Sequence, residues 1–101
     1  MQRYRNADFV WDNLKARRNL QKHGISFHRA TSAFLDRRAV SIYDEQHSID
    51  EDRWVLLGLD HTGNLLVVIH TFEVELNEEV RVRIISARKA TLTEAKHYGL
   101  G

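Results

Sequence analysis

The spacing of apolar side chains over residues 1–43 predicts a short strand, two helices and a second strand. Asp12 and Gly24 bracket the first helix, because a carboxylate caps helix N-termini and glycine adopts the left-handed conformation that ends helices. Ser26 caps the second helix, whose apolar residues recur at i, i+3 and i+7, the spacing of one buried helical face. We therefore predict a strand at 9–11, helices from 13 to about 23 and from 27 to 35, and a strand at 40–43.

The rest of the chain alternates apolar runs with polar turns, which predicts three further strands and a last helix. Residues 65–73 are apolar on both faces, so this strand is expected at the centre of a sheet. In the next strand valine and arginine alternate, which places Arg81 and Arg83 on the face opposite the valines. Thr91 and Glu94 have the spacing of a capping box. The predicted elements are strands at 53–60, 65–73 and 80–86 and a helix from 91 to about 98.

This order of elements predicts an α+β fold, with two N-terminal helices packed on a mostly antiparallel β-sheet and a short C-terminal helix. The chain of 101 residues has room for one domain, residues 1–101, with its own hydrophobic core. It has no cysteine, which excludes disulfides, thiolate nucleophiles and cysteine-ligated zinc. No apolar run is long enough to cross a bilayer, and no apolar segment follows the charged stretch Met1–Asn6 as in a signal peptide. We therefore expect a cytoplasmic protein with no membrane partner.

The formal net charge of +1 hides a sorting of charges along the chain. Residues 1–38 carry a net +6, residues 39–80 a net −9 and residues 81–101 a net +4. If the two basic ends meet in the fold, they form a cationic surface suited to phosphates. The acidic block, residues 39–80, would either shield this surface or attract a basic partner. The alternative is that the charges are unevenly scattered and have no common function.

The Arg81-x-Arg83 pair, continued by Arg88 and Lys89, is the sharpest chemical signal in the chain. A guanidinium is a planar fork that fits phosphate oxygens and stays charged at any relevant pH. The alternative is that these arginines lie on an exposed sheet face and pair there with carboxylates, for which the candidates are Glu73, Glu75 and Asp60.

The first helix places Lys15, Arg18 and Lys22 on one stripe, which is either a solvated face or one wall of a cationic groove. His23 falls in the last turn of this helix, where the helix dipole favours its charged form. His70 falls in the middle of an apolar strand face, where a buried and hydrogen-bonded core histidine is expected. Either histidine has the chemistry of a general acid or base. The others are expected to be exposed: His28, His47, His61 and His97.

The acidic loop from Asp44 to Asp52 contains His47 but has none of the spacings of known metal motifs. The chain also lacks a P-loop, a GxSxG nucleophile motif and a GxGxxG dinucleotide motif. We therefore expect no metal and no cofactor, and hydrolases that use a serine nucleophile are excluded.

Three segments together resemble the BrnT family of toxins. The N-terminal segment contains the string KHGISF at 22–27, and the middle segment contains Glu51-x-Arg53 and Gly58. The C-terminal segment contains RIISARKAT at 83–91, followed by Glu94 and Tyr98. The likeness covers about Phe9 to Tyr98. One departure is the segment 73–80, which is longer and more acidic than the short turn expected there.

The resemblance implies a RelE/ParE-like fold and the toxin of a type II toxin–antitoxin system. Such a toxin is a ribonuclease that cuts RNA and inhibits translation. The implied partner is a BrnA-like antitoxin with a DNA-binding portion, in a hetero-oligomer that represses its own operon by binding operator DNA.

Cleavage of RNA by attack of its own 2′-hydroxyl needs no metal and no covalent residue, only cations, a base and an acid around the phosphate. Arg83 and Arg88 are the candidates for stabilising charge on the phosphate, and His23 is the preferred titrating group. Arg53 either binds RNA or anchors the acidic loop through Glu51. The RNA-binding candidates are Lys22, Arg53, Lys89 and Arg81.

Two other functions stay open at this point. A ParE-like toxin on the same fold would inhibit gyrase through protein contacts, and a non-catalytic module would dock nucleic acid or an acidic peptide on its cationic face. The combination of His23 with Arg83 and Arg88 favours the ribonuclease.

Overall fold

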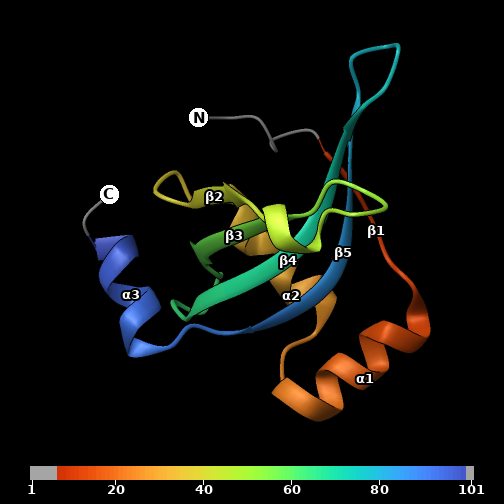
Figure 1. Ribbon diagram of the computed structural model, residues 1–101. Coiled ribbons are helices and arrows are strands. Elements are labelled where there is room, and N and C mark those ends of the chain that lie inside the picture. The colour runs from red at the N-terminus through yellow and green to blue at the C-terminus, as the bar shows by residue number, and fades with distance from the viewer. Residues whose placement is uncertain (1–6, 100–101) are drawn as a thin grey trace.

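Five strands form one mixed sheet in the computed structural model, which describes residues 7–99 (Figure 1). The strands are β1 (Asp8–Val10), β2 (Val40–Tyr43), β3 (Trp54–Leu59), β4 (Leu65–Val74) and β5 (Val80–Lys89). Their order in the sheet is β1-β5-β4-β3-β2, so β4 is central, as its two apolar faces predicted. Every neighbouring pair is antiparallel except β1 and β5, which are parallel. The stretch Met1–Asn6, considered for a signal peptide, lies outside the described residues.

The helices begin and end where the capping residues predicted. The Asp12 carboxylate accepts hydrogen bonds from the backbone N–H groups of Leu14 and Lys15 (2.8 and 3.0 Å), and Gly24 ends the helix in the left-handed conformation with φ of 71°. The helices are α1 (Asn13–His23), α2 (Phe27–Thr31) continued by the 3-10 turn η1 (Ser32–Leu35), the 3-10 turn η2 (Glu45–His47) and α3 (Leu92–Gly99). Within residues 7–99, no helix has the length and apolar composition that crossing a membrane requires.

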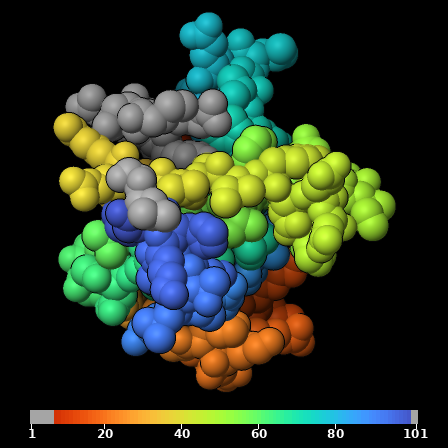
Figure 2. All heavy atoms as spheres, turned by 60° about the vertical axis from the view of Figure 1, so that its left-hand side comes forward, coloured from red at the N-terminus to blue at the C-terminus, as the bar shows by residue number. Residues whose placement is uncertain are grey.

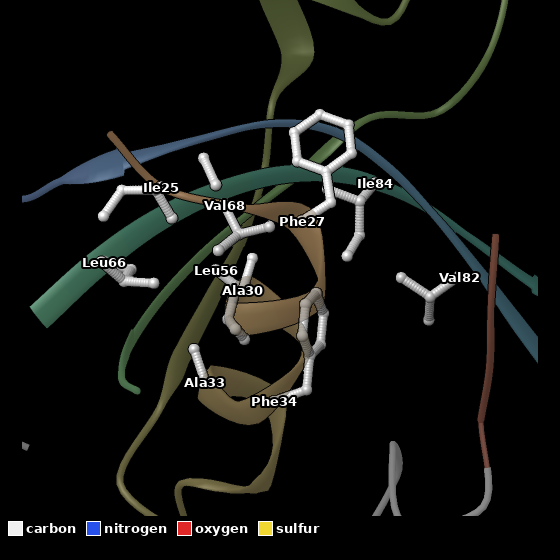
Figure 3. Packing of buried hydrophobic residues seen from close by; sticks show 11 residues of the cluster. Ile25, Phe27, Ala30, Ala33, Phe34, Leu56, Leu66, Val68, Val82 and Ile84 are labelled. Carbon is white, nitrogen blue, oxygen red and sulfur yellow. The ribbon is translucent and has the colours of Figure 1, made fainter. Parts of the chain in front are cut away.

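The hydrophobic core lies between α2, η1 and one face of the sheet (Figure 3). Phe34 contacts Phe9 of β1 and His70 of β4, with ring centroids 5.0 and 4.9 Å apart. His70 is fully buried, as expected for a core histidine, and desolvation lowers its pKa to about 4. Its Nδ1 lies 3.1 Å from the carbonyl oxygen of Thr71, within hydrogen-bonding distance.

Gly58 lets η1 approach β3 more closely than any other residue would. A Cβ at this position would lie 2.7 Å from the backbone oxygen of Ala33 and 3.1 Å from the Cβ of Ala39. Both contacts are shorter than ordinary van der Waals distances, so the packing of α2 and η1 on the sheet depends on this glycine.

Two features of β5 that affect the functional site differ from the prediction: the end of the strand and its register with β4. β5 continues to Lys89, three residues past the predicted end, because it keeps pairing with β4 as far as Leu66. A register shift in β4–β5 opposite Ile69 and His70 leaves Ile85 outside the regular pairing. Beyond this irregularity the side chains of β5 no longer follow the simple alternation that the sequence predicted.

The tip of the β4–β5 hairpin projects beyond the rest of the molecule (Figures 1 and 2). Two backbone hydrogen bonds, from Glu75 N to Glu79 O and from Glu78 N to Glu75 O, close its turn (2.8 and 2.9 Å). Glu78 takes a positive φ of 66° there. Most of the segment noted above for its length and acidity is therefore an exposed projection, and only Val80 at its end packs against the core.

Candidate functional site

A buried asparagine, Asn19, fixes α1 against the edge of β5. β1 pairs only with residues 81–83 of β5, so the edge beyond that point offers unpaired backbone groups. The Asn19 amide takes the place of a neighbouring strand there: its Nδ2 donates to the Ala87 carbonyl (2.7 Å), and the Ala87 N–H donates to its Oδ1 (3.0 Å). Nδ2 also donates to the carbonyl of Ile25 (2.9 Å), which ties the end of α1 to the start of α2.

Two adjoining pockets lie between α1 and β5, and we call them together the cationic groove. The pockets share Lys15 and Ile85. One end is lined by Val10, Trp11, Asp12 and Arg83, and the other by Arg18, Asn19, Lys22, His23 and Ser86. The two basic ends of the sequence therefore meet in the fold, with the cationic stripe of α1 as one wall and Arg83 in the other.

The cationic groove is long compared with a single phosphate group. Lys15 and His23 are eight residues apart on α1, which corresponds to about 12 Å along the helix axis. Arg83 shares its end of the groove with Lys15, whereas His23 and Lys22 share the opposite end. Of the predicted catalytic residues, the groove thus contains Arg83 and His23, placed at different points along its length.

Glu51, in the acidic loop, lies between two arginines at the edge of this site. Arg83 Nη2 donates to Glu51 Oε1, and Arg53 Nη2 lies 3.9 Å from the same oxygen. The loop is held by Ser48, whose Oγ accepts a hydrogen bond from the Arg53 N–H (2.9 Å). The Arg53 Nε is buried without a hydrogen-bond partner among residues 7–99. The sequence analysis considered Glu51 as the residue through which Arg53 anchors the acidic loop, and it did not predict the contact of Glu51 with Arg83. The Glu51-x-Arg53 spacing was the sequence signal that singled out both residues.

Arg81, predicted to bind RNA, pairs with Glu75 of the projecting hairpin (2.9 Å) and does not line the cationic groove. This is the carboxylate pairing that the sequence left open as an alternative for the arginines of β5. Lys89 is exposed at the end of β5 and also lies outside the groove lining.

Arg88, predicted to be catalytic, joins β5 to α3 through Glu94. Its two terminal nitrogens donate to the two Glu94 oxygens, both at 2.8 Å. Glu94 also accepts a hydrogen bond from the Thr91 N–H (2.8 Å) and completes the predicted capping box by donating its own N–H to Thr91 Oγ1 (3.2 Å). The hydrogen bonds from Arg88 lower the pKa of Glu94 to about 2, and Glu94 in turn raises the pKa of Arg88. Arg88 therefore takes part in anchoring α3.

The other end of α3 is held by Tyr98, whose hydroxyl donates to the Asp36 carboxylate (2.5 Å). Asp36 also accepts the Leu59 N–H (2.8 Å), so one carboxylate links α3 to β3. Burial, together with this hydrogen bond, raises the pKa of Tyr98 to about 12. The sequence did not predict this contact, because Asp36 and Tyr98 are 62 residues apart.

The histidines outside the cationic groove and the core lie on the surface of the described chain. The histidines expected to be exposed are exposed: His28, His47, His61 and His97. Residues 7–99 contain no group of three or more histidine, aspartate or glutamate side chains placed to hold a metal ion. The chemistry available in the cationic groove is therefore that of lysine, arginine, histidine and carboxylate side chains.

The comparisons with known proteins found a matching family and similar solved structures. The sequence profile of the ribonuclease toxin BrnT of type II toxin–antitoxin systems matches residues 11–94. The 1.1 Å crystal structure of the Brucella abortus ribonuclease toxin BrnT has a similar fold, with a TM-score of 0.54 and 22% sequence identity over 82% of this chain and 95% of that one. No curated protein sequence matched the chain.

Proposed function

Because the chain belongs to the BrnT family of ribonuclease toxins of type II toxin–antitoxin systems, we propose that it cleaves RNA in the cationic groove between α1 and β5. The observation that carries this proposal is the meeting of Arg83 with the lysine and arginine stripe of α1 in two adjoining pockets that share Lys15 and Ile85. An RNA strand carries one negative charge per nucleotide, so an extended groove with cations at intervals fits such a strand. We further propose that the fold is of the RelE/ParE type.

Arg83 is the proposed stabiliser of the charge that develops on the phosphate when the 2′-hydroxyl attacks it. Its Nη2 is held by Glu51, and Nε and Nη1 are the donors proposed for the phosphate oxygens. A cation that is already oriented when the reaction begins costs no reorganisation, and such a donor contributes on the order of 3 kcal/mol to the transition state. Removing Arg83 should therefore lower the cleavage rate by about a hundredfold.

His23 is the proposed titrating group, acting from the end of the cationic groove where Lys22 binds the RNA backbone. Arg88 is proposed as the second stabiliser of phosphate charge, and RNA would have to replace Glu94 as its partner. Three further cations are proposed to bind the RNA backbone. Arg53 in the loop before β3 and Arg81 on β5 would exchange a glutamate for phosphate, and Lys89 at the end of β5 is exposed.

A type II toxin has a protein antitoxin as its partner, and we propose that here it is a BrnA-like protein with a DNA-binding portion. The hetero-oligomer would bind operator DNA through the antitoxin and repress the operon. We also propose that the free toxin acts in the cytoplasm and inhibits translation by degrading RNA. No metal or other cofactor takes part in this mechanism.

The test is induced expression of the wild type beside Arg83→Ala and Arg81→Ala, with growth and total RNA followed over minutes. The two arginines lie two residues apart on β5, and each pairs with one glutamate, but only Arg83 lines the cationic groove. We expect RNA loss and growth arrest with the wild type, slower RNA loss with Arg81→Ala, which removes only a contact to the RNA backbone outside the groove, and neither effect with Arg83→Ala. Growth arrest with intact RNA would contradict the ribonuclease proposal and point to a protein target, and full toxicity of Arg83→Ala would contradict the site.

A further inference from the structure

The second flank of α1 faces α2 and forms a groove of different chemistry, which we call the apolar groove. It is lined by Trp11, Ala16, Arg17, Leu20, Ser26, Phe27 and His28, and its surface is almost wholly apolar. Asn19 and His23 mark the side of α1 that faces β5, whereas Ala16 and Leu20, one turn apart, mark the side that faces α2. One helix thus separates the cationic groove from the apolar groove.

The apolar groove leaves a large hydrophobic side chain exposed to water. Leu20 is 50% exposed, although it lies beside Ala16 on the flank facing α2. Trp11 and Phe27 meet edge to face, with ring centroids 6.1 Å apart, so the groove has a rigid aromatic wall. An aromatic wall beside a half-exposed leucine suits the insertion of an apolar side chain from a partner protein.

The rim of the apolar groove carries one permanent cation, Arg17. Arg17 and His28 line the groove and are both exposed, and the next residue on α1, Arg18, lines the cationic groove. No carboxylate side chain belongs to the lining of the apolar groove. A segment that inserts apolar side chains here is therefore bound more tightly if it also carries carboxylates beside them, because opposite charges across an interface attract.

We propose that the apolar groove docks the antitoxin, through an acidic amphipathic segment that places an apolar side chain against Trp11 and Leu20 and carboxylates against Arg17. The proposal rests on the proposed function for the identity of the partner, since a type II toxin is neutralised by a protein. A helix with its side chains is about 10 Å across, so a segment docked in the apolar groove lies one helix width from the cationic groove. From there its carboxylates extend over the outer surface of α1 and block the access of RNA to Arg18.

The test compares Leu20→Glu with Leu14→Glu in the full-length toxin. Both leucines lie on α1 and are equally exposed, at 50% and 48%, but Leu14 does not line the apolar groove. The probe is the purified protein encoded by the reading frame adjacent to the toxin gene. Its affinity for each toxin variant is measured by calorimetry, and its effect on RNA cleavage is measured in the same preparations.

We expect Leu20→Glu to cleave RNA at the wild-type rate but to bind the antitoxin at least about tenfold more weakly and to escape its inhibition, since loss of a central apolar contact has effects of this size. Leu14→Glu should bind within about twofold of the wild type. In a further variant, Arg17→Glu, the loss of affinity should be larger at low salt than at high salt.

The docking proposal is overturned if Leu20→Glu binds the antitoxin as tightly as the wild type, or if Leu14→Glu is weakened to the same extent. It is also overturned if Leu20→Glu loses RNA cleavage in the absence of antitoxin while circular dichroism shows it folded, because the apolar flank would then belong to the RNA site. If the wild type itself cleaves no RNA, the proposed function fails, and the affinities still decide the docking site.

Discussion

Replacing Asn19 with alanine tests whether this one side chain fixes α1 to the sheet. The change removes three buried hydrogen bonds of 2.7 to 3.0 Å and leaves two carbonyls and one N–H, those of Ala87 and Ile25, without that partner. A buried polar group left unsatisfied costs about 1–3 kcal/mol, and alanine regains a few tenths through helix propensity. With partial access of water, the expected loss in the free energy of unfolding is about 3 kcal/mol. For a domain of this size the melting temperature should fall by about 12–24 °C.

Urea and thermal unfolding followed by circular dichroism measure this loss, with Asn13→Ala as the matched control. Asn13 is the exposed asparagine at the start of the same helix, and its replacement should change the stability by less than about 0.5 kcal/mol. A loss below about 1 kcal/mol for Asn19→Ala, or an equal loss for both variants, would refute the reasoning.

Asn19→Asp sharpens the test, because it keeps the shape of the side chain and its acceptor for the Ala87 N–H. The introduced carboxylate would face the carbonyls of Ile25 and Ala87 where the amide now donates, so its pKa in the folded state should be raised. A group with a raised folded pKa binds more protons when folded, so the stability of this variant should decrease as the pH rises from 4 towards 8. If its stability at pH 8 equals that of the wild type, the amide donors contribute nothing.

Three further predictions concern the core and α3. The pKa of His70 is lowered to about 4 from its ordinary 6.5, so between these two pH values the unfolded chain binds a proton at His70 that the folded chain does not. The free energy of unfolding should therefore fall as the pH drops from about 6.5 to about 4. In urea unfolding, His70→Gln should lose this part of the pH dependence. Gly58→Ala should lower the free energy of unfolding by about 1–3 kcal/mol, because its Cβ would press on the backbone of Ala33; thermal unfolding measures this. Arg88→Ala and Glu94→Gln break the same ion pair, but only Arg88→Ala removes a cation. If Arg88 acts on RNA, cleavage assays on the two purified variants should show a loss of activity with Arg88→Ala alone. Equal losses of activity would assign Arg88 to anchoring α3.

Local chain features were predicted well because their partners lie only two or three residues apart. The caps at Asp12 and Ser26 and the capping box from Thr91 to Glu94 are set by short-range geometry, and the structure confirms all three. The alternation of valine and arginine in β5 also placed Val82 in the core. The sequence thus predicted the order of the helices and strands and placed most of their ends to within one residue, but it missed the end of β5 and the short turn η2.

The contacts that build the candidate site could not be predicted in the same way, because each joins residues far apart in the chain. Asn19 reaches Ala87 across 68 residues, and Glu51 reaches Arg83 across 32. Nothing local distinguishes Arg83, which lines the cationic groove, from Arg81, which pairs with the hairpin. That distinction comes from the parallel pairing of β1 with β5, which brings the start of α1 beside Arg83.

The parallel pairing of β1 with β5 has a consequence for the time at which activity arises. β1 and α1 are synthesised before their partners on β5, from Arg81 to Ala87, and Asn19 is 68 residues from Ala87. Contacts between such distant residues form late in folding, since closing a long loop costs entropy before any contact repays it. The wall of the cationic groove formed by α1 therefore has no opposite wall until β5 has been synthesised. The nascent chain carries no assembled groove before that point.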